Sequence, residues 1–139
     1  MAQWATSTGS AARPGIRDAR GTVALVRADG TAVCERCDVA DRMLPRMKGL
    51  LGKRTLPPGE GLLIRPAPSI HTYFMRFPID VVFLSGDGHV LKVSEHVKPW
   101  RARSARRAYA VLELAAGEAR RRRIAAGDLL ETAETSGVS

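Results

Sequence analysis

The stretch IDVVFLSGDGHVLKV, residues 79–93, decides the fold class of this chain. Its Asp-Gly pair at 87–88 supplies the positive φ angles of a tight hairpin turn, and the runs on both sides are rich in Val, Leu and Ile, which favour strands. The same arrangement recurs at 29–30, where an Asp-Gly pair separates TVALVR from TAVCER. The sequence therefore predicts two β-hairpins, over residues 22–36 and 79–97.

Four further strands are predicted outside the hairpins. The runs are GLLIR (61–65), SIHTYFMR (69–76), YAVLELA (109–115) and DLLETA (128–133). Strands therefore outnumber helices, and the two do not alternate regularly. This order favours a single compact α+β domain with a curled, mostly antiparallel, barrel-like sheet and one or two short helices.

Two segments have the pattern of helices. In residues 38–52, apolar side chains recur at steps of three and four residues, which is the helical period. Asp38 or Asp41 is the expected N-cap, and Gly52 is the expected end. The second helical segment, GEARRRRIAAG at 117–127, is short and has glycine at both ends.

The length of 139 residues fits one domain. No apolar run reaches the about 20 residues that cross a bilayer, and the N-terminus lacks the apolar core of a secretory signal. We therefore expect a cytoplasmic protein without a membrane partner. We expect residues 1–20 and 134–139 to be flexible tails and residues 21–133 to form the domain.

The chain is basic, with 22 Lys and Arg against 14 Asp and Glu. The loop KPWRARSARR at 98–107 carries five cations, no acid and the aromatic Trp100. Such a loop predicts weak, sequence-independent binding to nucleic acid, because one tryptophan is too little for a multi-base stacking surface. The alternative is an indole that covers the open end of the sheet, with the arginines simply solvated.

Asp80 and Glu113 are lone carboxylates in otherwise apolar strands, so burial requires partners for both. Arg76 and His71 are the candidate cations for at least one of them. One hypothesis is a ligand-binding cluster, or an acid–base pair working with the histidine. The other is an internal salt bridge that sets strand register, and this is the favoured alternative. The predicted ligand-binding residues are His71, Arg76, Asp80, Trp100 and Glu113.

Cys34 and Cys37 form a C-x-x-C pair where a predicted strand leads into the first predicted helix. Such a pair can serve as reactive thiols or as two ligands of a zinc ion. Structural zinc needs four ligands, however, and the histidines of this chain are scattered. We therefore expect reduced, inert thiols, no metal and no cofactor. Purified protein should contain no stoichiometric zinc that depends on either cysteine.

The run RMKGLLGKRTLPPGEGLLI (46–64) and the run HTYFMRFPIDVVFLSGDGHV (71–90) resemble the signature segments of a known family. KPW (98–100), VLELAAG (111–117) and the late Gly-Asp pair complete the resemblance to the domain of unknown function 192 family. The resemblance covers about residues 33–131. The matching positions are Gly49, Leu50, Arg54, Gly61, Met75, Asp80, Gly88, Pro99, Glu113, Gly117, Gly127 and Asp128.

The resemblance implies a compact α+β domain with a curled, barrel-like sheet, and it implies no settled activity. The C-x-x-C pair is not part of the family pattern, and we expect no export signal of the kind that some relatives carry. The expected function is binding of a small ligand in a polar pocket of the curled sheet, and the net charge of +8 favours an anionic one. The alternatives are an enzyme that uses Asp80 or Glu113 with His71, and a weak nucleic-acid-binding module that uses the loop at 98–107.

Overall fold

The fold is known from a computed structural model, which describes residues 15–41, 56–72 and 76–135. These residues form mostly β-structure with one short α-helix and one short 3₁₀-helix, η1. No helix among them is long and apolar enough to span a membrane. The elements are η1 (Ile16–Asp18), β1 (Thr22–Arg27), β2 (Ala32–Asp41), β3 (Glu60–Arg65), β4 (Ser69–His71), β5 (Ile79–Leu84), β6 (Val90–Val97), β7 (Ala102–Ser104), β8 (Ala110–Ala115), α3 (Glu118–Arg121) and β9 (Leu130–Glu134).

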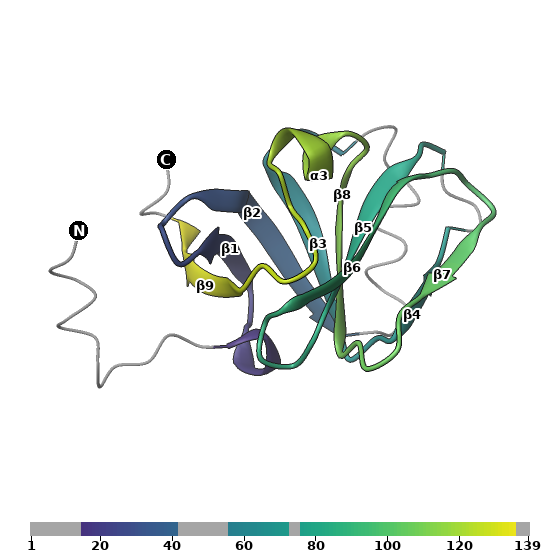
Figure 1. Ribbon diagram of the computed structural model, residues 1–139. Coiled ribbons are helices and arrows are strands. Elements are labelled where there is room, and N and C mark those ends of the chain that lie inside the picture. The colour runs from purple at the N-terminus through teal and green to yellow at the C-terminus, as the bar shows by residue number, and fades with distance from the viewer. Residues whose placement is uncertain (1–14, 42–55, 73–75, 136–139) are drawn as a thin grey trace, which may run out of the picture.

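A seven-stranded sheet in the order β6-β5-β8-β3-β2-β1-β9 forms the body of the molecule, and β4 pairs with β7 in a separate two-stranded sheet (Figure 1). Every pair is antiparallel except β2 with β3. Both predicted hairpins are confirmed, as β1–β2 and β5–β6. Their turn glycines, Gly30 and Gly88, have the positive φ angles that the Asp-Gly pairs predict.

The central strands are buried on both faces of the large sheet. Every residue of β5 is buried. Because side chains alternate along a strand, Val82 packs into one apolar cluster and Val81 into another on the opposite face. The first cluster includes Ile16 and Ala19, which lie in the stretch expected to be a loose tail. The second is completed by side chains next to and within the β4–β7 sheet.

The sheet curls but does not close into a barrel, so the barrel-like arrangement is not confirmed. Its two edge strands meet only near Gly88 and Val90. The backbone N–H of Leu130 donates to the carbonyl of Gly88 at 2.9 Å, and the N–H of Val90 donates to the carbonyl of Asp128 at 2.8 Å. These bonds tie the corner of β6 to the start of β9 without a full ladder between them.

Three sequence predictions need correction. Asp38 does not start a helix, because β2 runs on to Asp41 and pairs with β3; the rest of that predicted helix, residues 42–52, lies outside the described residues. The second helix has only four residues, and Arg123 beyond it has a φ of 57°. The loop at 98–107 contains strand β7, because β4 supplies a partner for it.

Gly61 in β3 has no room for a side chain. A Cβ there would lie 2.9 Å from the Sγ of Cys34 and 2.9 Å from the backbone oxygen of Glu113. We expect Gly61→Ala to lower the free energy of unfolding by about 1–3 kcal/mol, because the core must shift to accept the methyl group. Chemical denaturation measures this. Gly15→Ala is the control, since nothing lies within 4 Å of its Cβ position, and an equal loss in both variants would contradict the expectation.

Candidate functional site

The polar cluster that the sequence predicts does not form as one site. Asp80 and Glu113 are both buried, as expected. In the β5–β8 ladder, however, Asp80 pairs with Leu114, whereas Glu113 pairs with Val81. Neighbouring residues of a strand point to opposite faces, so the two carboxylates lie on opposite sides of the sheet. They do not form a shared acid–base pair.

Asp80 is held by the backbone, not by a cation. One carboxylate oxygen accepts the N–H of His96 at 2.8 Å, and the other accepts the N–H groups of Gly117 and Ala119, both at 2.9 Å. The expected partner Arg76 is exposed and forms no ion pair with Asp80 in the described part of the chain. The side chain of His71, the other expected partner, lies outside the described residues. Asp80 therefore joins β5 to the end of β6 and to the first turn of α3.

A polar cleft of about 570 Å³ lies between the β1–β2 hairpin and the segment that follows α3. We call it the arginine cleft. None of its residues belongs to the ligand-binding set predicted from the sequence. Its lining residues are Arg27, Asp29, Thr31, Ala32, Glu35, Arg121, Arg122 and Arg123.

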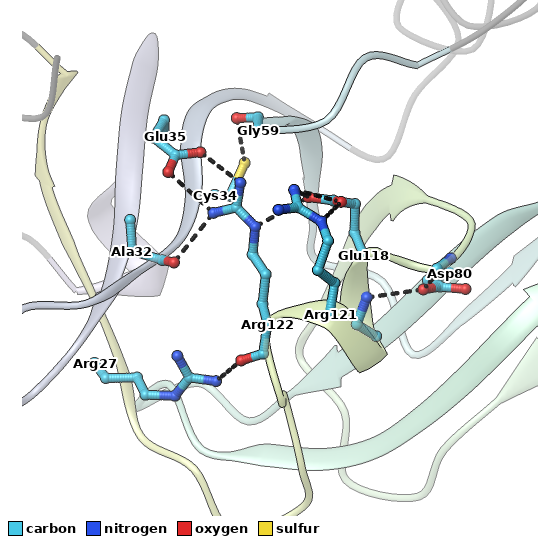
Figure 2. Close-up of polar contacts among 11 residues, drawn as sticks. Arg27, Ala32, Cys34, Glu35, Gly59, Asp80, Glu118, Arg121 and Arg122 are labelled. Carbon is cyan, nitrogen blue, oxygen red and sulfur yellow. Dashed lines mark hydrogen bonds and ion pairs between the residues drawn. The ribbon is translucent and has the colours of Figure 1, made fainter.

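Arg122 is the fixed centre of the arginine cleft. Its side chain is only 13% exposed. Its Nε donates to Glu118 at 3.0 Å, and its two terminal nitrogens donate to the two oxygens of Glu35 at 2.8 and 3.1 Å. A further bond at 3.1 Å reaches the backbone oxygen of Ala32 (Figure 2). The guanidinium thus joins β2 to α3 with several directional, charge-assisted bonds.

The charges of this network support one another. The hydrogen bond from Arg122, with the positive charge of that guanidinium, lowers the pKa of Glu35 despite partial burial. Burial alone would lower the pKa of Arg122, but the hydrogen bonds and negative charges of Glu35 and Glu118 outweigh it and raise the pKa. Both partners are therefore charged at neutral pH.

The other arginines of the cleft differ in how firmly they are held. Arg27 donates to the backbone oxygen of Arg122 and to Thr31, and its Nε lies 3.7 Å from Asp128. Arg121 makes two bonds to Glu118, at 2.7 and 2.9 Å, but its side chain is 59% exposed. Arg123 is exposed, and its side chain makes no polar contact within the described part of the chain.

The run of four arginines was the sequence signal for this cleft, and its meaning was missed. Four consecutive residues cannot share one face of a continuous helix. Here the helix ends at Arg121, and the left-handed conformation of Arg123 separates it from Arg122. The i,i+4 pair of Glu118 and Arg122 was the second available signal. The partner from β2, Glu35, is distant in sequence and was not predictable from spacing.

Cys34 and Cys37 lie inside β2, not at a junction with a helix. Residues three apart in a regular strand point to opposite faces, yet both thiols belong to one apolar core. The reason is a β-bulge: two steps along β1, from Val23 to Leu25, match three steps along β2. Within the described residues, no group of three His, Cys, Asp or Glu could hold a metal, and the zinc prediction stays a prediction.

Both thiols are fully buried and not joined as a disulfide. Burial raises the pKa of Cys37 well above its ordinary value of 9.0, and the hydrogen bond and charge of Cys34 add to this. The Sγ of Cys34 lies 3.6 Å from the backbone oxygen of Gly59, as a weak donor. Since the thiolate is the reactive form, the site favours an inert Cys37.

We expect Cys37 not to react with an aromatic disulfide reagent at pH 8 in the folded protein, and to react once the protein is denatured. Because the folded-state pKa exceeds the unfolded one, the neutral thiol stabilises the fold fully below the unfolded pKa. That stability declines as the pH rises above about 9. Thiol titration in a Cys34→Ser variant, with and without denaturant, isolates Cys37. Rapid reaction of the folded variant would contradict the expectation.

We expect Asp80→Asn to lower the free energy of unfolding by about 3 kcal/mol, because a carboxamide presents one acceptor and one donor to three N–H groups. Thermal or chemical unfolding measures this. Asp18→Asn, at an exposed position of η1, is the matched control. Equal stability of the Asp80 variant and the wild type would show that these three bonds contribute little.

Comparison with known proteins agrees with the suspected family. The model of the domain of unknown function 192 family, described as Uncharacterized ACR, matches residues 24–132. A Sinorhizobium meliloti structure, described as a proposed transcription regulator, is 27% identical over 82% of this chain and 94% of that chain, with a TM-score of 0.69. A Novosphingobium aromaticivorans protein of unknown function has the same fold, at 24% identity over 79% of this chain and 83% of that chain, with a TM-score of 0.67. No curated protein matches the chain.

Proposed function

The chain belongs to the domain of unknown function 192 family, and we propose that it binds a small anionic ligand in the arginine cleft. The observation that carries this proposal is the contrast within the cleft. Arg122 is locked in place by two carboxylates, whereas Arg121 and Arg123 present exposed guanidinium groups beside it. A firmly held floor with exposed guanidinium donors at its rim suits an anion.

The acids that line the cleft are already engaged by groups of the protein. Glu35 is engaged by Arg122. Asp29 accepts the backbone N–H of Thr31 at 2.9 Å and its hydroxyl at 2.7 Å, which lowers the pKa of Asp29. The donors of Arg123 are not engaged by any described residue. They are therefore available to a carboxylate or a phosphate, whose oxygens match the planar fork of arginine.

The dimensions of the cleft support a small molecule as the ligand. Its volume of about 570 Å³ falls within the roughly 300–1,000 Å³ typical of small-molecule sites. Its polar lining favours a hydrophilic ligand that is recognised by charge and hydrogen bonds. A phosphate ester or a small polycarboxylate has these properties.

We expect calorimetric titration with inorganic phosphate, pyrophosphate and small di- and tricarboxylates to show saturable binding to the wild type. Arg123→Glu should weaken the best of these ligands by about tenfold or more, because a charge-assisted hydrogen bond becomes a repulsion. Mass spectrometry of small molecules that co-purify with the wild type extends the search beyond this panel.

Arg20→Glu is the matched control, since Arg20 is also exposed, makes no polar contact with the described residues and undergoes the same change of charge. Its affinity should equal that of the wild type at moderate salt. An equal loss of ligand affinity in both variants would show that the effect comes from net charge alone. Unchanged ligand affinity in Arg123→Glu would show that the ligand does not bind in the arginine cleft.

A second candidate function is weak nucleic-acid binding through residues 98–107. The observation that favours it is charge: Lys98, Arg106 and Arg107 are exposed and make no ion pair with any described residue. The description of the Sinorhizobium meliloti structure as a proposed transcription regulator is in line with this candidate. The segment does not overlap the arginine cleft, so the two functions are compatible.

A further inference from the structure

We propose that the turn at residues 98–101 is a stacking platform for single-stranded nucleic acid, with one unpaired base on Trp100 and the flanking phosphates on the cations around it. The inference rests on the second candidate function, and it adds the form of nucleic acid and the residue that recognises it. We call this segment the Trp100 turn.

The Trp100 turn is clamped by a single buried residue, Thr72. The hydroxyl of Thr72 donates to the backbone oxygen of Lys98 at 2.7 Å and accepts the N–H of Arg101 at 2.9 Å. The backbone N–H of Thr72 donates to the backbone oxygen of Arg101 at 2.8 Å, and the backbone oxygen of Thr72 accepts the N–H of Trp100 at 3.0 Å. Four bonds from one residue hold the turn against the end of the β4–β7 sheet (Figure 1). The turn is therefore a rigid base for the indole.

The clamp holds Trp100 in a conformation that tryptophan rarely adopts. Its φ is 65°, and the residue is 56% exposed. Among the described residues, four that are not glycine have a positive φ, and three of them lie in this region: His96, Trp100 and Arg107. Bulky residues at positive φ are outliers that persist when surrounding bonds enforce them, and such outliers gather at binding sites. Trp100 is thus both held at positive φ and more than half exposed.

The chain segments that meet at the Trp100 turn carry cations and no acid. Neither residues 61–79 nor residues 97–112 contain an Asp or Glu. Arg101 and Arg103 donate to backbone oxygens of their own neighbours and not to carboxylates. Glu95, the acid that precedes this region in β6, is engaged by Arg120 at 3.4 Å. The five cations from 98 to 107 are thus available to phosphates.

A single strand fits this surface better than a duplex. An indole stacks on a base only when the face of that base is free, as in single strands, loops and ends. The α-helix of the described part has four residues, and the strands of the β4–β7 ribbon have three each, so neither element is long enough to read a major groove. One stacked base gives little sequence preference, because every base has an aromatic face.

Intrinsic fluorescence provides a direct test. The chain has two tryptophans, so Trp4→Phe leaves Trp100 as the only one. We expect short thymidylate oligomers to quench its emission saturably at low salt. With labelled oligomers, Trp100→Ala should raise the dissociation constant about tenfold or more, while Trp100→Phe retains most of the affinity. Arg101→Ala should make the salt dependence shallower by about 0.7 in log–log slope, as for one lost phosphate contact.

The controls separate the platform from general attraction by charge. Arg20→Ala removes an exposed arginine that makes no polar contact with the described residues and should match the wild type. A blunt duplex should bind more weakly than the single strand and should be indifferent to Trp100→Ala.

Each alternative outcome has a definite meaning. If oligomers bind but neither quench Trp100 nor depend on it, the platform is wrong and the second candidate function stands. If no oligomer binds at low salt, both are wrong. If phosphatidylserine vesicles bind where oligomers do not, the surface recognises a membrane and the proposal is rejected.

Discussion

The arrangement of this molecule depends on the buried carboxylate of Asp80 and the three backbone N–H groups that it accepts. These bonds place the start of α3 against β5, which lies one strand in from the β6 edge of the sheet. Glu118, in the first turn of α3, then holds Arg122, and Arg122 holds Glu35 in β2. The position of the arginine cleft therefore follows from a carboxylate that does not line it.

Glu118 and Arg122 also explain how a run of like charges becomes an ordered site. Burial of Glu118 requires compensation, and two arginines provide it from the same short segment. The end of the helix then separates the side chains that follow. Arg122 is enclosed between two carboxylates, while Arg123 remains exposed with a left-handed backbone. An arginine held by ion pairs thus lies beside an arginine whose side chain is exposed, an arrangement that suits a site for a small anion.

The Trp100 turn, like α3, is fixed by one buried polar side chain. Thr72 fixes the Trp100 turn as Asp80 fixes α3, in both cases through bonds to backbone groups distant in sequence. Such bonds are satisfied in only one geometry, so each holds its segment rigidly. The two proposed sites differ in chemistry: the arginine cleft offers guanidinium donors in a hollow, and the Trp100 turn presents an aromatic residue among cations.

Local sequence determined the two hairpins, most of the strands, the burial of Asp80 and Glu113, and the family. These follow from turn residues, β-branched runs and the cost of burying a charge, which are properties of neighbours in the chain. Tertiary structure decided the rest. Strand register put the two carboxylates on opposite faces, and a bulge put both thiols on one face. Pairing with β3 kept Asp38 in a strand, and the ion pair between Glu35 in β2 and Arg122, just after α3, made the cleft. Each of these depends on which distant segments meet, and the spacing of residues along one segment does not carry that information.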